Sequence, residues 1–385
     1  MSGHSVVIVR SSFSAYGGVE RVALDVIQKL LQKQINVELL TWPNQHWPVS
    51  HPNLHIISIG INKGPRFLQA LSFNIGVENY LKKNNPECIF SFDRITTFTH
   101  MHGGGGTHRT FLKIKNTNSS FFSRNFRRIS LFHFYTLYVE RRGFLNPRLK
   151  SIQCASSLVK KDIINDYGLS EEKLEVIPNG IDWHKIGSTY HHRQQTIAKL
   201  INRHHLDAKR NYLLFLGSGF ERKGLDIAIR GVAGMPEHYG LLVVGKGRTT
   251  PYKQLAKQVS MDHRLYFIGP QENGWKYAVL CKALVLPSRY EPFGMAPAEA
   301  NAMGIPVLIS NKTGYLDWVE EGKNGVILKF PTNHETIADA FSRLLKVIES
   351  PCLNAEQIRK GAYRLDYGAL MNYLIHDFLG IESRP

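Results

Sequence analysis

The chain has 385 residues, of which 43% are hydrophobic and 21% charged, as in an ordinary soluble globular protein. This length exceeds what a single hydrophobic core usually covers, so two domains are expected. The formal net charge of +17 indicates an anionic partner, which leaves open a nucleic acid, a phosphorylated substrate or an acidic membrane surface.

The cysteines and the apolar runs indicate in which cellular compartment the protein is expected. The four cysteines are far apart and show no CxxC spacing, which argues against a zinc site and for reduced thiols in a cytoplasmic protein. Residues 1–10 lack the basic start and the long apolar run of a signal peptide. No apolar run is long enough for a membrane span, so no transmembrane helix is expected.

The first part of the chain alternates predicted strands and helices, which favours a doubly wound parallel sheet. Strands are expected at 5–10, 37–41, 54–59, 87–92, 151–155 and 174–177, and helices at 19–34, 72–83 and 158–167. Gly17 and Gly18 lie in the first strand-to-helix turn, where backbone amides can approach an anion. Such a turn is also common as a purely structural feature.

Residues 99–109 (THMHGGGGTHR) place three histidines around four glycines at a predicted strand end. Their spacing and the lack of nearby acids argue against a metal site. One interpretation is a plain flexible loop. The other is a catalytic or substrate-binding loop, whose glycines allow close backbone approach and whose His and Arg side chains hydrogen-bond substrate oxygens.

Residues 105–150 form what we name the basic-aromatic segment, because ten Lys or Arg and nine Phe or Tyr are interleaved with a single acid, Glu140. This composition is typical of an interfacial membrane surface, and a nucleic-acid patch has the same composition. A third interpretation is that residues 129–139 form a core helix and that the arginines are simply solvated.

A sharp turn at 178–182 marks the predicted domain boundary, and the strand–turn–helix pattern then repeats. The loop at 217–224 (GSGFERKG) lacks the ending of a Walker P-loop, but it brings Arg222 and Lys223 to a glycine-rich turn that suits a diphosphate. Strands are expected at 212–216, 241–244, 265–269, 283–287 and 307–309, and helices at 188–209, from 225, and at 274–281, 335–349 and 355–379.

The stretch at 289–307 (RYEPFGMAPAEANAMGIPV) contains two carboxylates around a turn. Glu291 lies in the turn after a predicted strand, and Glu299 lies in a helix opened by Pro292 or Pro297 and closed by Gly304. Carboxylates beside a helix N-terminus at a strand end suit a polyhydroxylated, phosphorylated ligand. The alternative is a pair of unrelated surface acids.

Five motifs in register make the chain resemble the retaining family 4 glycosyltransferases, most of all the lipopolysaccharide core glucosyltransferase I branch. They are the Glu-x7-Glu pattern of Glu291 and Glu299, GGVER at 17–21, VIPNGID at 176–182, the loop at 217–224, and GKNG at 322–325. The resemblance implies an α/β GT-B fold, in which two Rossmann-like domains with parallel sheets face each other across a cleft. The expected N-terminal acceptor and membrane domain is 1–178, with a C-terminal helix at about 367–385 packing back on it, and the nucleotide-sugar domain is 179–366.

The resemblance also implies roles for individual residues. Glu299 would hold the ribose hydroxyls, and Glu291 would contact the transferred sugar. Lys223 matches the phosphate-binding lysine, whereas Ser218 replaces the family's usual arginine, a charge that Arg222 would supply. His102 matches a functional histidine and would orient the donor sugar. The other donor-site candidates are Gly17, Gly18, Gly245, Ile268, Phe293, Gly294 and Met295, and the acceptor-site candidates are His100, Gly103, His108 and Arg109.

The predicted function is retaining transfer of a hexose, glucose from UDP-glucose, to a lipopolysaccharide core or similar glycolipid. Arg222, Lys223 and helix amides would neutralise the leaving diphosphate, so no cofactor and no metal are expected. The expected partners are a UDP-sugar, a glycolipid and, through the basic-aromatic segment, the anionic cytoplasmic face of the inner membrane, with no nucleic acid. The alternatives are a mannosyl-, heptosyl- or N-acetylglucosaminyltransferase of the same fold and, from another class, a basic nucleic-acid-binding protein.

Overall fold

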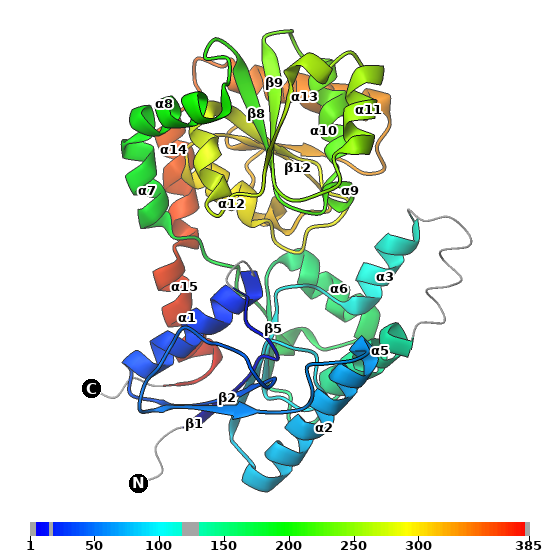
Figure 1. Ribbon diagram of the computed structural model, residues 1–385, viewed down its shortest axis with the longest axis vertical. Coiled ribbons are helices and arrows are strands. Elements are labelled where there is room, and N and C mark those ends of the chain that lie inside the picture. The colour runs from blue at the N-terminus through cyan, green and yellow to red at the C-terminus, as the bar shows by residue number, and fades with distance from the viewer. Residues whose placement is uncertain (1–4, 15–17, 118–130, 382–385) are drawn as a thin grey trace. The chain divides into compact units, whose positions relative to one another are not determined.

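The computed structural model describes residues 5–14, 18–117 and 131–381 of the chain. It divides into two compact units, unit 1 with residues 1–179 and 369–385, and unit 2 with residues 180–368. Each unit is built on one parallel sheet covered by helices (Figure 1). The predicted α/β class with two parallel sheets is therefore confirmed.

Unit 1 contains a seven-stranded parallel sheet in the order β3-β2-β1-β4-β5-β6-β7. Its strands are β1 (Ser5–Val9), β2 (Asn36–Thr41), β3 (Leu54–Ser58), β4 (Cys88–Ser91), β5 (His100–Gly103), β6 (Ser151–Cys154) and β7 (Leu174–Val176). Its helices are α1 (Gly18–Gln32), α2 (Arg66–Asn84), α3 (His108–Thr117), α5 (Leu131–Phe144) and α6 (Ser157–Tyr167). The strand order reverses between β1 and β4, and parallel sheets bind ligands at the carboxyl ends of the strands at such a point.

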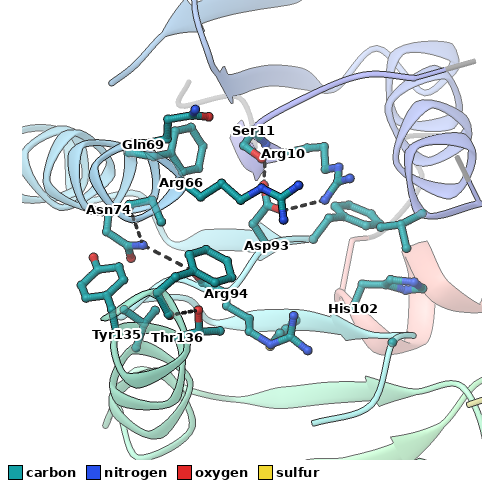
Figure 2. Close-up of a pocket in the computed structure, with 18 of the residues that line it drawn as sticks. Arg10, Ser11, Arg66, Gln69, Asn74, Asp93, Arg94, His102, Tyr135 and Thr136 are labelled. Carbon is teal, nitrogen blue, oxygen red and sulfur yellow. Dashed lines mark hydrogen bonds and ion pairs between the residues drawn. The ribbon is translucent and has the colours of Figure 1, made fainter. Parts of the chain in front are cut away.

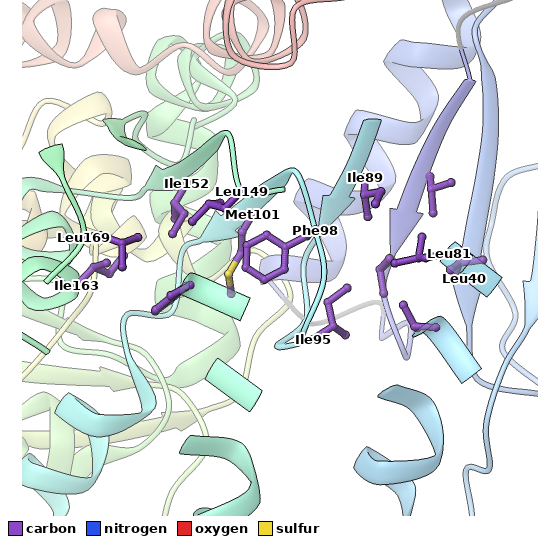
Figure 3. Packing of buried hydrophobic residues seen from close by; sticks show 14 of the residues in the cluster. Leu40, Leu81, Ile89, Ile95, Phe98, Met101, Leu149, Ile152, Ile163 and Leu169 are labelled. Atoms are coloured by element: carbon purple, nitrogen blue, oxygen red, sulfur yellow. The ribbon is translucent and has the colours of Figure 1, made fainter. Parts of the chain in front are cut away.

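Buried aliphatic and aromatic side chains hold one face of this sheet against α2, α5 and α6 (Figure 3). Ile89 and Ile152 from the strands are fully buried, as is Val159 of α6, and Leu81 of α2 is nearly so. Such burial is the main source of stability for a sheet whose strands read as continuous apolar runs.

The last segment of the chain differs from the single helix predicted over 355–379. It consists of α14 (Ala355–Gly361), a 3-10 turn (Ala362–Leu365), α15 (Tyr367–Tyr373) and a π-helical turn (Leu374–Phe378). The prediction of one helix was wrong because backbone groups at 365–367 bond to Ile181 instead of continuing the helix: the Ile181 amide donates to Leu365, and the Tyr367 amide donates to Ile181. From residue 369 onward the segment belongs to unit 1, where Phe378 packs on Phe90.

Unit 2 contains a six-stranded parallel sheet in the order β10-β9-β8-β11-β12-β13. Its strands are β8 (Asn211–Leu216), β9 (Tyr239–Val244), β10 (Leu265–Gly269), β11 (Cys281–Leu286), β12 (Val307–Ser310) and β13 (Gly325–Leu328). Its helices include α7 (Trp183–His191), α8 (Arg193–His204), α9 (Phe220–Lys223), α10 (Leu225–Ala233), α11 (Thr250–Gln258), α12 (Met295–Ala302) and α13 (His334–Ile348). Residues 188–209 are thus not one surface helix, because the helix is interrupted at His192, which ends α7 and precedes α8.

Candidate active site

The loop after β8 folds tightly because three of its glycines have positive φ. Gly224 has φ +75°, and a Cβ there would lie 2.1 Å from the Pro287 carbonyl oxygen after β11. At Gly217 (φ +134°), a Cβ would lie 2.6 Å from Cε of Lys223, so the lysine side chain lies directly over this glycine. The glycines therefore allow Lys223 to reach the ends of two neighbouring strands.

Glu291 lies in the turn after β11 and meets both cations of the β8 loop. Its Oε2 accepts from Nζ of Lys223 at 2.7 Å and from Nη1 of Arg222 at 3.1 Å. Its backbone is held by Lys312 and Gly314 on the loop after β12. Burial alone would raise the pKa of Glu291, but the charges of Lys223 and Arg222 outweigh burial and lower it. The site therefore contains an ionised carboxylate held between two cations.

Glu299 lies on α12, four residues after its first residue Met295, and its electrostatic surroundings differ from those of Glu291. Burial raises its pKa to about 7, with Lys223 acting in the opposite direction. Within the described part of the chain, its carboxylate has no hydrogen-bond or ion-pair partner. Glu299 is half-buried, and a carboxylate that is partly shielded from water and has no donor gains from a ligand that supplies one. Gly294 (φ +108°) and Met295 begin this helix, where the backbone amides are free of intrahelical partners.

The loop after β9 is tied to the loop after β8. The Lys246 amide donates to Oγ of Ser218 at 3.1 Å. A Cβ at Gly245 (φ +151°) would lie 2.2 Å from the Gly217 carbonyl oxygen, so the two loops touch through their backbones. The Gly245 amide donates to Gly269 at the end of β10, directly after Ile268. The Ser218 hydroxyl therefore holds the loop after β9 in place. This structural role is separate from the predicted role of Ser218 in donor binding.

Phe293 is placed differently from the other donor-site candidates. Its side chain is 2% exposed and packs edge-on against Tyr315 and Trp318, with ring centroids 6.1 Å and 5.4 Å away. The ring is therefore part of the core of unit 2, and only the backbone of Phe293 remains for a ligand.

His102 in unit 1 has a defined tautomer. Its Nδ1 lies 2.8 Å from Oε1 of Gln153, and Nε2 of Gln153 donates to the Ile177 carbonyl, which orients the amide. Nδ1 therefore carries the proton, and Nε2 is a buried acceptor without a partner. Burial lowers the pKa of His102 to about 4, more than Gln153 raises it, so the ring is neutral near neutral pH.

His102 and Gly103 line a cavity of about 610 Å³ within unit 1 (Figure 2). Arg10 on its wall donates to Asp93 at 2.6 Å and to Glu20 at 2.7 Å. Arg94 donates to Glu140 at 2.8 Å and to the Gly106 carbonyl at 2.9 Å. The cavity thus combines glycine backbone, a neutral histidine and paired arginines.

The other histidine-loop candidates lie outside the lining of this cavity. His100 packs against Phe378, with ring centroids 5.3 Å apart. Nε2 of His108 lies 3.1 Å from Nδ1 of His133, and Arg109 donates to the Asp166 carbonyl at 2.9 Å. Of the five site candidates in this loop, His102 and Gly103 lie at the cavity, whereas the side chains of His100, His108 and Arg109 pack against neighbouring elements.

Several predicted residues lie outside the ranges that the structure describes. Gly17 is one of them, whereas Gly18 begins α1. Arg124, Arg127 and Arg128 of the basic-aromatic segment lie outside the described residues as well. Across 5–14, 18–117 and 131–381, no group of three His, Cys, Asp or Glu side chains is arranged to hold a metal ion. No helix in the same ranges combines the length and apolarity needed to cross a bilayer.

Three residues at or beside this cavity were not among the predicted site residues. They are Gln153, which bonds to His102, and Asp93 and Asn74, which line the cavity. Gln153 is the β6 residue in register with His102 on β5, and a glutamine in the apolar strand SIQC was the available signal. Asn74 on α2 is 6% exposed although it lies in the middle of a helix, a position with no motif around it.

Two family models match almost the whole chain between them. The model described as "Glycosyltransferase Family 4" matches residues 16–185, and the one described as "Glycosyl transferases group 1" matches residues 196–362. The first therefore lies almost entirely in unit 1 and the second in unit 2.

Individual relatives are more distant. The lipopolysaccharide glucosyltransferase WaaG of Escherichia coli is 21% identical over 335 residues, which are 86% of either chain. The uncharacterized glycosyltransferase MJ1607 of Methanocaldococcus jannaschii is 28% identical over 197 residues, a match that spans about half (49%) of that protein.

Solved structures give the same fold over nearly the full length. The crystal structure of WaaG aligns with a TM-score of 0.76 at 19% identity, covering 95% of this chain and 97% of the other. HepE of Anabaena in complex with UDP-glucose aligns with a TM-score of 0.70 at 16% identity, covering 98% of this chain and all (100%) of the other.

Proposed function

The chain belongs to the family 4 glycosyltransferases of the GT-B fold, and on that premise we propose that it transfers glucose from UDP-glucose to a lipopolysaccharide core or similar glycolipid. The observation that carries the proposal is the group formed by Glu291, Arg222 and Lys223 at the carboxyl ends of β8 and β11. Two cations and a helix N-terminus at one strand edge suit a diphosphate, and two carboxylates beside them suit sugar hydroxyls.

The donor is assigned to unit 2 in this proposal. Lys223 and Arg222 bind the diphosphate, Glu299 accepts from the ribose hydroxyls, and Glu291 accepts from the transferred hexose. The high pKa of Glu299 supports its role, because a carboxylate without a donor in the free protein gains two hydroxyl donors on binding. UDP-glucose is the donor named for the HepE structure, and glucosyl transfer is named for WaaG.

The chemistry proposed for these groups is electrostatic. As the bond from the anomeric carbon to the diphosphate breaks, its electron pair remains on the phosphate oxygen, and Arg222 and Lys223 stabilise that charge. The acceptor oxygen bonds to the same face of the sugar, with retention, and its proton passes to the leaving phosphate. Neither Glu291 nor Glu299 acts as an acid or base in this scheme, and no metal ion takes part.

A glycolipid acceptor agrees with the surface of α5. Leu131, Phe134 and Tyr138 are exposed by 67%, 73% and 53%, respectively, on a helix whose last turn contains Arg141 and Arg142. Exposed aromatic and aliphatic side chains beside arginines suit the interface of an anionic membrane. We infer that the basic-aromatic segment binds the cytoplasmic face of the inner membrane as a peripheral contact.

A thermal-shift screen with nucleotide-sugars tests the donor. A ligand at 100 times its dissociation constant stabilises the native state by roughly 2.7 kcal/mol. We expect UDP-glucose to raise the melting temperature more than UDP-N-acetylglucosamine, GDP-mannose and ADP-heptose do. A larger shift with one of the other three would reassign the donor, and no shift with any of them would contradict transferase function.

A further inference from the structure

The helix that carries Glu299 is held at its C-terminal end by a buried arginine. Arg359 of α14 is 2% exposed, and its Nη1 donates to the carbonyl of Ala302, the last residue of α12, at 2.8 Å. Within unit 2, α12 packs against both α7 and α14 (Figure 1). Arg359 lies outside all five sequence motifs, and the proposed function does not use it.

The Arg359 guanidinium is held by aromatic rings instead of a carboxylate. Its Cζ lies 3.9 Å from the ring centroid of Trp183 and 5.2 Å from that of Tyr190, both on α7. Among the residues that the structure describes, no carboxylate forms an ion pair with it. Burial lowers the pKa of Arg359, and the charge of Glu356 offsets this only in part. Burying a cation without a paired carboxylate is costly, which indicates that its contacts with α7 and α12 serve a purpose.

α12 depends on such an anchor because its own packing side chains are small. Its buried residues are four alanines, Pro297 and Asn301. Small side chains do not interlock with neighbouring helices, so they fix the position of α12 along its axis poorly. The polar anchors are Asn301, whose amide nitrogen donates to two backbone carbonyls at 3.0 and 3.1 Å, and Arg359. A shift of this helix would move Glu299 and the first-turn amides together.

We propose that Arg359 is a positioning residue for the donor site. By tying the C-terminal end of α12 to α7, it sets where Glu299 and the amides of Gly294 and Met295 lie relative to Lys223. The proposal rests on the proposed function for the identity of the ligand, a nucleoside diphosphate. Without the anchor, α12 shifts, and the affinity for the nucleoside diphosphate falls because its binding groups are no longer preorganised.

Calorimetric titration of UDP into the full chain tests the proposal with two buried arginines. Arg264 is the matched control, because it is 3% exposed and donates to backbone carbonyls between α10 and β9, including that of Tyr239 at 3.0 Å. We expect UDP to bind about tenfold more weakly to Arg359→Met than to the wild-type protein. Arg264→Met should keep wild-type UDP affinity, although urea titration should show a loss of stability in both variants.

A pair of glycine variants tests the same contact without removing the charge. A Cβ at Gly187 on α7 would lie 2.3 Å from Nη2 of Arg359, whereas a Cβ at Gly361 at the end of α14 would meet no atom within 4 Å. Gly187→Ala should displace the guanidinium and weaken UDP binding by about threefold or more. Gly361→Ala should bind UDP as the wild-type protein does. This pair decides the question if Arg359→Met does not fold.

A double-mutant cycle distinguishes positioning from a general loss of stability. If Arg359 acts through α12, Glu299→Gln should weaken UDP binding less in the Arg359→Met background than in the wild-type background, because Glu299 is already displaced. In the Arg264→Met background, Glu299→Gln should have its full effect.

Four results would overturn the proposal. They are wild-type UDP affinity in Arg359→Met, equal losses in Arg359→Met and Arg264→Met, equal affinities of Gly187→Ala and Gly361→Ala, and full additivity of Arg359→Met with Glu299→Gln. Each of them, with normal UDP binding by the wild-type protein, defeats this inference alone. If the wild-type protein binds no UDP, the proposed function fails and this inference fails with it.

Discussion

At the scale of single residues, Glu291 and Glu299 are two carboxylates eight positions apart with opposite electrostatics. Lys223 and Arg222 lower the pKa of Glu291, whereas burial raises that of Glu299 to about 7. Glu291 is therefore ionised before any ligand arrives, and Glu299 is balanced between its two forms near neutral pH. The difference assigns Glu291 to a preorganised charge cluster and makes Glu299 the group whose ionisation a ligand can change.

The affinity for UDP should therefore depend on pH through Glu299. Ionised Glu299 accepts from ribose hydroxyls, so its contribution should strengthen binding by about tenfold between pH 6 and 8, around a pKa of about 7. Calorimetric titration of the wild-type protein and Glu299→Gln checks this, because titration of UDP itself affects both. An identical pH profile for the two proteins would contradict the role. Without ligand, the sign is reversed: ionisation of this half-buried group lowers the free energy of unfolding as pH rises toward 7.

A second residue-scale prediction concerns the glycine beside His102. A Cβ at Gly104 would lie 2.3 Å from Nε2 of His102, whereas a Cβ at Gly105 would meet no atom within 4 Å. Gly104→Ala should displace the imidazole and lower turnover of UDP-glucose by about tenfold or more. Gly105→Ala, the matched control, should keep wild-type turnover. Initial rates of UDP release measure both, and equal rates for the two variants would remove His102 from the site.

At the scale of elements, the strands and strand–loop–helix units were largely predictable because buried parallel strands read as apolar runs that end in glycine. The positions at which helices end were less predictable from the sequence. The helix predicted over 355–379 is interrupted because its backbone pairs with Ile181, a partner far away in the sequence. The pairing of His102 with Gln153 has the same character, since it depends on the register of β5 and β6. Local patterns cannot show contacts that only the assembled sheet creates.

The C-terminal segment should be a structural part of unit 1. Phe378 is buried against Phe90 and His100. Phe378→Ala should lower the free energy of unfolding by about 3–5 kcal/mol, as for other buried aromatic deletions. Asp377→Ala, at the exposed neighbouring position, should change it by about 0.5 kcal/mol or less. Urea titration followed by circular dichroism measures both, and a small loss in Phe378→Ala would show that the segment is not needed for the core.

At the scale of the whole molecule, the net charge of +17 predicted an anionic partner without identifying it. The described part of the basic-aromatic segment adds exposed apolar side chains on α5 to that charge, a combination that favours a membrane surface over nucleic acid. The fold and the family could be predicted from the order of five motifs. The donor, the acceptor and the membrane contact stay predictions, because they depend on loop and surface side chains without a motif.

Membrane binding should depend on the apolar side chains of α5 as well as on charge. Phe134→Glu should lower binding to vesicles of anionic phospholipid by about tenfold or more, because a charge replaces an inserted aromatic ring. Glu335→Gln, an exposed change on unit 2, should bind as the wild type does. Co-sedimentation measures both, and unchanged binding of Phe134→Glu would exclude α5 from the membrane contact.

For the whole enzyme we propose that Arg222 and Lys223, in place of a metal ion, hold the diphosphate of a nucleotide-sugar in unit 2. Calorimetric titration of UDP-glucose in the presence of EDTA tests it most directly. We expect one saturable site in the wild-type protein, binding at least about tenfold weaker in Lys223→Ala, and wild-type affinity in Lys257→Ala on the exposed surface of α11. Binding that requires a divalent metal, or equal affinity of Lys223→Ala and the wild-type protein, would contradict it.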